Sequence, residues 1–273
     1  MISNPVPALY FDGTTVDVLW DNHDAAIEWY RRHMAWEIGQ TENWKPDPRC
    51  TQGRMTRLNW GTWLISSLTS ERLPHHYAER GTVESNVRLC WRTRDIKAVH
   101  RRFQSDGVRL SDLYRGPGNT EYFDFWATNE GIRFTAQEDQ SVQEDGFVPS
   151  WIRIGVRELA QSAEWYRRYM GMEVENDFSE YGFVIMSLGL NHQRDQKSLW
   201  VLEQLPEGAY TGKVSGQVWP VCWIPDREAL FQYRTHLIDS GIEASEVGGF
   251  VTRGLISFHF YDPDGNRLNV SSM

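Results

Sequence analysis

Along the chain, hydrophobic and polar positions follow a strand pattern and then a helix pattern, and this order recurs. Residues 87–91 alternate as expected for a strand, and residues 95–106 place their apolar side chains on one face of a helix. In the second half of the chain, residues 219–224 and 226–240 repeat this order. The pattern predicts units in which a strand is followed by a helix and then by further strands.

A longer repeat divides the chain into two similar halves. Residues 25–37 (AAIEWYRRHMAWE) match residues 161–173 (QSAEWYRRYMGME). The strand, turn and strand of residues 123–134 recur at residues 261–270 with nearly the same spacing. Two long matches at one offset indicate an internal duplication, and each half itself divides into two units.

The closing segment contains the clearest turn in the chain. Asp262-Pro263-Asp264-Gly265 combines a proline, which fixes one φ angle, with a glycine, which accepts a positive φ. Because hydrophobic runs flank these four residues, the segment predicts a hairpin between two strands.

These features together resemble the vicinal oxygen chelate superfamily, which includes glyoxalase I, bleomycin-resistance proteins, fosfomycin-resistance enzymes and extradiol dioxygenases. The resemblance rests on four βαβββ units in two pairs, on the Trp-Tyr helix followed by Met-Gly-Met-Glu, and on the closing Asp-Pro-Asp-Gly-Asn-Arg-Leu. It covers roughly residues 8–138 and 148–273.

The resemblance implies an α+β fold of two tandem vicinal-oxygen-chelate domains, each built from two βαβββ units with curved mixed sheets. Residues 1–139 would form the first glyoxalase-like domain, in which the motifs are eroded. Residues 140–149, polar and then containing Gly and Pro, would form the linker, and residues 150–273 the second domain.

The composition indicates the cellular compartment of the protein and the kind of partner it binds. The net charge of −9 argues against nucleic-acid binding, which normally needs a basic surface. No apolar run approaches the roughly 20 residues that cross a membrane, and three cysteines form no close metal-binding pair. We therefore expect a cytoplasmic protein whose partner is a small molecule, either as a monomer with paired domains or as a homodimer.

Strand alternation predicts a concave surface, or cup, in the second domain. Residues 152, 154 and 156 would pack on the helices, so the intervening residues face inward. The same reasoning gives the predicted lining: Trp151, Arg153, Trp219, Trp223, His259, Arg267 and Asn269. Large aromatic faces with a few polar groups suit a flat or partly apolar small molecule. Alternatively, the tryptophans pack against one another and fill the cup.

The first domain has a different predicted lining. Thr15 and Asp17 would face inward on its first strand, Arg88 on the strand that opens its second unit, and Arg133 and Thr135 on its last strand. Asp17 among arginines would either keep an anionic ligand site open or neutralise the positive charge.

The resemblance also implies metal positions, but the residues there are not metal ligands. Members of the family use His, Gln or Glu from the first strand, His from the strand opening the second unit, and Glu from the last strand. Domain two carries Trp151, Trp219 and Asn269 instead, and domain one carries Thr15, Arg88 and Thr135. An indole nitrogen only donates hydrogen bonds, and a guanidinium repels a cation.

Glu203 and His259 are the remaining candidate metal ligands. Glu203 resembles a glutamate that some glyoxalases contribute from the fourth strand, and with His259 it would supply two ligands, too few for the usual site. The sequence therefore predicts no metal and no other cofactor, with a divalent metal kept as the less favoured alternative.

Three functions are consistent with these observations. The leading hypothesis is a metal-independent protein that binds a small aromatic or amphipathic molecule in the cup of the second domain. The second is an enzyme, either a metal-dependent lyase or dioxygenase of the same superfamily or an isomerase that uses His259 as its acid or base. The third is an interaction module in which both cups are filled.

Overall fold

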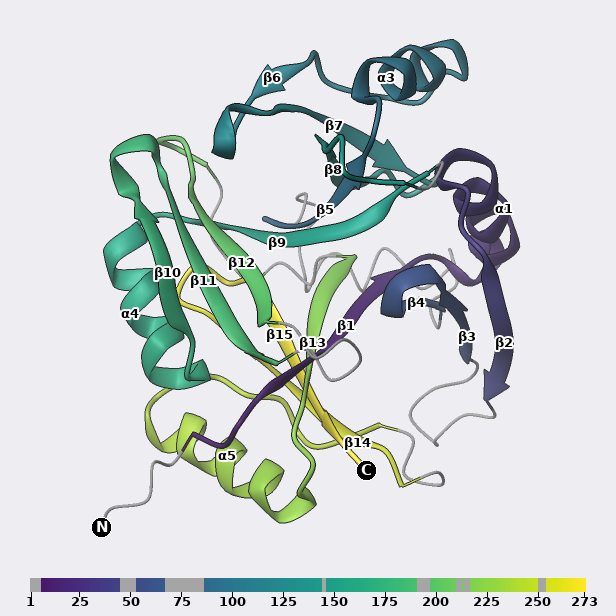
Figure 1. Cartoon of the computed structure of the whole chain (residues 1–273). Helices are drawn as coiled ribbons and strands as arrows, with labels where there is room; N and C mark the ends of the chain where they lie inside the picture. The colour runs from purple at the N-terminus through teal and green to yellow at the C-terminus, as the bar shows by residue number, and fades with distance from the viewer. Residues whose placement is uncertain are drawn as a thin grey trace.

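The computed structural model (Figure 1) describes residues 6–44, 53–66, 86–143, 146–190, 197–209, 213, 217–249 and 254–273. Within these residues the chain forms four successive units, each consisting of a strand, a helix and further strands. The four helices of these units lie on the outside of two large sheets (Figure 1). No helix in the described part of the chain is long and apolar enough to cross a membrane.

The four units differ slightly in their number of strands. The first unit contains β1 (Tyr10–Asp17), α1 (His23–Met34), β2 (Ile38–Trp44), β3 (Gly53–Leu58) and β4 (Thr62–Ser66). The second contains β5 (Val87–Thr93), α3 (Ile96–Ser105), β6 (Tyr114–Arg115), β7 (Glu121–Ala127) and β8 (Ile132–Glu138). The third contains β9 (Val148–Val156), α4 (Leu159–Met170), β10 (Glu173–Phe178), β11 (Phe183–Leu190) and β12 (Lys197–Gln204). The fourth contains β13 (Val218–Trp223), α5 (Arg227–Asp239), β14 (Ile256–Tyr261) and β15 (Arg267–Ser272).

The predicted α+β fold of tandem two-unit domains is confirmed, and so are the helices. Residues 95–106 contain α3, and residues 226–240 contain α5. Both helices begin after an aspartate whose side chain accepts a backbone N–H: Asp95 from Ala98 at 2.8 Å and Asp226 from Glu228 at 2.9 Å. Strand β9 begins at Val148, so the last two residues of the predicted linker belong to a strand.

Each sheet combines one unit from each half of the chain. The seven-stranded sheet has the order β14-β15-β13-β1-β4-β3-β2 and joins the first and fourth units. The eight-stranded sheet has the order β10-β11-β12-β9-β5-β8-β7-β6 and joins the second and third units. Two antiparallel pairs make these connections, β1 with β13 and β5 with β9. The expectation that each cup is built within one half was therefore wrong.

The two units of one half contact each other mainly through aromatic side chains. In the first half, Trp29 of α1 stacks on Phe125 of β7, with ring centroids 6.3 Å apart and planes 12° apart. In the second half, Trp165 of α4 lies 6.2 Å from Phe260 of β14. These equivalent contacts come from the repeated Trp-Tyr helices, so the duplication in the sequence corresponds to a repeated packing interaction.

The closing Asp-Pro-Asp-Gly turn holds the fourth unit against the third. Asp262 accepts hydrogen bonds from the backbone N–H groups of Asp264 (2.9 Å) and Asn266 (2.8 Å), and from the Tyr166 hydroxyl of α4 (2.8 Å). Asp264 accepts from Arg157 Nε at 2.8 Å, and Asn266 donates to the Gly155 carbonyl of β9 at 3.0 Å. The turn is therefore a buried clamp between the two sheets as well as a hairpin.

The weaker turn of the first half makes the equivalent contact. Glu130, between β7 and β8, accepts hydrogen bonds from the Leu19 backbone N–H (3.1 Å) and from Asn22 Nδ2 (2.8 Å), just before α1. In both halves, the hairpin turn of the later unit binds the junction between the first strand and the helix of the earlier unit.

Substituting Asp262 with alanine should lower the free energy of unfolding by about 3 kcal/mol. The change leaves the buried N–H groups of Asp264 and Asn266 and the Tyr166 hydroxyl without their acceptor. Urea unfolding followed by circular dichroism measures the effect. Glu164→Gln, at an exposed pair with Arg167 on α4, is the control and should leave the stability unchanged. Equal stability of the two variants would contradict the role of the turn as a clamp.

Candidate functional site

The eight-stranded sheet curves around a cavity of about 640 Å³. Residues from its two ends line this one cavity: Tyr114 and Arg115 of β6 on one side, Phe178 of β10 and Phe183 of β11 on the other. Strands β6 and β10 stand at opposite ends of the strand order. A sheet whose first and last strands share a cavity has a concave face, so this surface is a cup.

The wall on the β10 side is aromatic. Phe178 and Phe183 are register partners on either side of a short turn, and their ring centroids lie 5.1 Å apart. Tyr181, within that turn, is 72% exposed and also lines the cavity. Three aromatic rings at a hairpin tip therefore offer apolar faces to a molecule that enters the cup.

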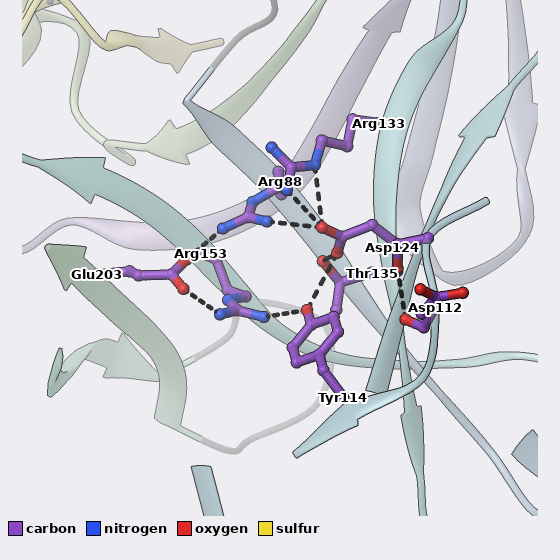
Figure 2. A network of polar contacts seen from close by, with 9 residues as sticks. Arg88, Asp112, Tyr114, Asp124, Arg133, Thr135, Arg153 and Glu203 are labelled. Carbon is purple, nitrogen blue, oxygen red and sulfur yellow. Dashed lines mark hydrogen bonds and ion pairs between the residues drawn. The ribbon is translucent and has the colours of Figure 1, made fainter. Parts of the chain in front are cut away.

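The floor of the cup is formed by Tyr114, Arg153 and Glu203, which belong to a larger ion-pair network (Figure 2). Glu203 of β12 binds two guanidinium groups: Arg153 Nη2 of β9 donates to Oε1 at 2.5 Å, and Arg88 Nη2 of β5 donates to Oε2. Arg153 and Arg88 are direct cross-strand partners in the β5–β9 pair. Like charges in that position destabilise a sheet unless a counter-charge lies between them, and Glu203 supplies that charge.

A second carboxylate extends the network. Asp124 of β7 accepts hydrogen bonds from Arg88 Nη1 (3.1 Å), Arg133 Nη2 (2.5 Å) and the Thr135 hydroxyl (2.6 Å). The Tyr114 hydroxyl joins the two parts, because it accepts from Arg153 at 3.1 Å and donates to Asp124 at 3.2 Å. The network therefore extends across five strands and into β6.

Burial and charge set the protonation states of this network. Burial alone would raise the pKa of Asp124, but Arg88, Arg133 and the Thr135 hydroxyl hold it below its ordinary value. Burial raises the pKa of Tyr114 to about 12, so its hydroxyl keeps its proton at neutral pH. Burial and then neighbouring Arg153 lower the pKa of Arg88, which nevertheless stays charged because guanidinium groups lose their proton only far above neutrality.

The network does not fit a metal ion. Arg88 lies at the position where the family resemblance implies a ligand, and the Glu203 oxygens are each bound by a guanidinium group. Within the residues that the structure describes, no group of three or more His, Cys, Asp or Glu side chains could hold a metal. A divalent cation would also meet the repulsion of three guanidinium groups.

The seven-stranded sheet carries a different polar surface. His259 of β14 lies directly opposite Asn269 of β15, which in turn pairs with Val221 of β13. Arg267 donates from Nε to Asn269 Oδ1 at 3.0 Å, and its guanidinium carbon lies 4.3 Å from the centre of the Trp219 ring. The arginine and the indole thus pack on each other in a cation–π contact.

The eight residues predicted for the site are divided between the two sheets. Trp151, Arg153 and Glu203 belong to the eight-stranded sheet, and Arg153 and Glu203 line its cavity. The other five belong to the seven-stranded sheet: Trp219, Trp223, His259, Arg267 and Asn269. A single cup lined by the seven predicted residues was a wrong prediction, because β9 pairs with β5 and β12 whereas β13 pairs with β1 and β15.

The lining predicted for the first domain divides in the same way. Arg88, Arg133 and Thr135 are together in the eight-stranded sheet as expected, but Thr15 and Asp17 belong to β1 of the other sheet. The acidic residue among the arginines is Asp124. It could have been found from strand alternation, since it stands between the buried Phe123 and Phe125 and must face the opposite side. Tyr114 lies in a strand of two residues, too short for a periodic signal.

Two tandem two-unit domains that build curved sheets define a protein of the vicinal oxygen chelate fold. Residues 149–270 match the sequence model of the Glyoxalase/Bleomycin resistance protein/Dioxygenase superfamily. No curated protein matches the sequence.

Solved structures show the same fold over nearly the whole chain. The E144Q mutant of glyoxalase I from Zea mays superposes with a TM-score of 0.66 at 14% identity, covering 97% of this chain and 94% of its own. A putative dioxygenase from Bacillus subtilis superposes with a TM-score of 0.64 at 12% identity, covering 98% of this chain and 86% of its own. At these identities the similarity extends to the fold and no further.

Substituting Asp124 with asparagine should lower the free energy of unfolding at pH 7 by about 3 kcal/mol or more, because it leaves three guanidinium groups with one carboxylate. The pKa of Asp124 is lower in the folded chain than its ordinary 3.8. The stabilisation is therefore complete above about pH 4 and is lost as the pH falls through the lowered value.

Urea unfolding between pH 2 and pH 7 measures this difference. The difference in stability between the wild-type protein and Asp124→Asn should narrow as the pH falls below about 4. Asp24→Asn, at an exposed pair with Arg54, is the matched control and should follow the wild type throughout. If Asp124→Asn were as stable as the control at pH 7, the ion-pair network would not stabilise the fold.

Proposed function

We propose that this protein binds a small aromatic or amphipathic molecule, without a metal ion, in the cup of the eight-stranded sheet. The observation that carries the proposal is the cavity of about 640 Å³ that ends on Arg153 and Glu203. Its size lies within the range of about 300–1,000 Å³ typical of small-molecule sites. An open cavity of this size argues against the alternative in which both cups are filled.

Independence from a metal is supported by the donor set. Arg88 and Arg153 each bind one oxygen of Glu203, so a cation at that carboxylate would lie beside two guanidinium groups. The Arg153 guanidinium also presents N–H groups at the cavity, and its bonds to Tyr114 and Glu203 fix their directions. Such a floor can orient a ligand by hydrogen bonding alone.

The preference for an aromatic ligand is supported by the opposite wall. Phe178, Tyr181 and Phe183 lie at the tip of one hairpin and line the cavity together. A flat ring buries the most apolar area against such a wall, and each aromatic pair contributes roughly 0.5–1.5 kcal/mol beyond burial. The tryptophan-rich face of the other sheet is separate from this cavity, so the ligand is assigned to the phenylalanine and tyrosine wall.

Substituting Phe183 with alanine should weaken the binding of a naphthalene derivative about tenfold or more, because it removes a ring from the cavity wall. Isothermal titration calorimetry with naphthamide measures the change. Trp219→Ala, on the seven-stranded sheet, is the matched control and should bind as the wild type does. Dialysis against EDTA should leave the affinity unchanged.

Two outcomes would contradict the proposal. A loss of binding in Trp219→Ala together with normal binding in Phe183→Ala would move the ligand to the other sheet. Stoichiometric iron, manganese, nickel or zinc in the purified protein, lost together with binding on EDTA treatment, would make the site a metal site.

A further inference from the structure

We infer that the second half of the chain has a further ligand site, which binds a small organic cation of the quaternary ammonium class. The site is a cavity of about 380 Å³ between α4, the segment that follows α5 and the closing turn, and it is called the turn pocket below. It shares no lining residue with the cup of the eight-stranded sheet, so it is independent of the ligand proposed for that cup.

The lining of the turn pocket combines aromatic rings with a carboxylate. Trp165 of α4 and Tyr261 at the end of β14 contribute the rings, and Glu243 contributes the carboxylate. The face of an aromatic ring attracts a cation, and a carboxylate adds the opposite charge. The cavity also lies within the range of about 300–1,000 Å³ typical of small-molecule sites.

The chain's own lysine shows how a cation is held in this pocket. Lys213 Nζ lies 5.7 Å from the centre of the Tyr261 ring and forms an ion pair with Glu243. An ammonium group is therefore held by both the ring and the carboxylate, which is the arrangement that an ammonium ligand would adopt.

The internal duplication identifies the equivalent place in the first half. In each half, an isolated β-bridge joins the segment after the second helix to the strand that precedes the hairpin turn: Leu110 with Phe125, and Ala244 with Phe260. Arg109 and Glu243 each precede one partner of the bridge, and Trp126 and Tyr261 each follow the other partner. Arg109 and Trp126 therefore correspond to Glu243 and Tyr261.

The two halves differ in the source of the cation. In the first half, the Arg109 guanidinium carbon lies 4.0 Å from the centre of the Trp126 ring, so the neighbouring strand segment itself supplies the cation. In the second half, this position carries Glu243, and its charge is reversed. The aromatic ring is thus retained, while the residue beside it has become one that attracts a cation from elsewhere.

A ligand can displace Lys213 at small cost. The side chains of Lys213 and Glu243 are 53% and 61% exposed, so water screens their ion pair. A lysine ammonium is also strongly hydrated and regains its water when it leaves the ring. A quaternary ammonium group has methyl groups in place of N–H groups, so it contacts Tyr261 and Trp165 with less loss of hydration. This contrast favours a quaternary ammonium ligand over the lysine.

Choline and its uncharged analogue 3,3-dimethylbutan-1-ol test the inference, because they have nearly the same shape. Titration of the wild-type protein at pH 7, followed by saturation-transfer NMR, should show choline binding at least about threefold more tightly than the alcohol. Raising the salt concentration should reduce this preference, since Glu243 is exposed.

Two variants of the same ion pair should act in opposite directions. Lys213→Gln removes the competing ammonium group and should strengthen choline binding about three- to fivefold. Glu243→Gln removes the carboxylate and should weaken it by a similar factor. Both side chains are exposed, so both variants should fold normally. Glu246→Gln, at a carboxylate that is 90% exposed and paired with Arg234, is the matched control and should not change the affinity.

Four outcomes would overturn the inference. Equal binding of choline and the alcohol would show that charge is not recognised. A change in the same direction in Lys213→Gln and Glu243→Gln would make the ion pair a structural part of the pocket wall. Absence of choline binding in both the wild type and Lys213→Gln would remove the site. Loss of choline binding in Phe183→Ala would move the cation to the cup of the eight-stranded sheet, whereas binding as in the wild type would support a separate site.

Discussion

The pairing of β5 with β9 is the constraint on which the candidate site depends. This antiparallel contact joins two units that are consecutive in sequence but belong to different halves of the duplication. It brings Arg88 opposite Arg153, and it creates the sheet whose outer strands close around the cavity. The equivalent pairing of β1 with β13 builds the other sheet from the two ends of the chain. Within each half, the units are held instead by aromatic packing and by the hairpin-turn clamps, so both kinds of contact are needed to complete either cup.

Local features of this fold could be predicted from the sequence, whereas the strand neighbours could not. The period of apolar residues and the capping aspartates give the helices, because both are properties of short segments. Alternation along a strand tells which residues share a face: Arg153 lines the cavity, whereas Ile152 and Ile154 belong to the hydrophobic core. It says nothing about which strand lies alongside, since β9 presents the same face whether it pairs with β5 or with a strand of the fourth unit. The assignment of Trp219 to the face of Arg153 failed for this reason.

The guanidinium groups of the network give the cup a chemistry different from that of a metal site. A metal ion in such a cup would supply a concentrated charge with open coordination positions, and its ligands would have to be deprotonated. Guanidinium groups supply a fixed positive charge at any physiological pH, spread over several N–H donors that point in set directions. Their cost is the desolvation of three charged groups, which Asp124 and Glu203 offset by direct hydrogen bonding. The floor of the cup consists of the protein's own side chains, which a chelator would not remove.

The pairing of β1 with β13 also affects the order in which the two sheets can form. The first unit is synthesised before the other three, yet the strand that covers the edge of β1, β13, belongs to the fourth unit. The eight-stranded sheet has no such delay, because its two units follow each other directly. Contacts between distant segments form slowly, and an uncovered strand edge is open to pairing with other chains. The second and third units can therefore assemble first, whereas the edge of β1 stays uncovered until β13 has been synthesised.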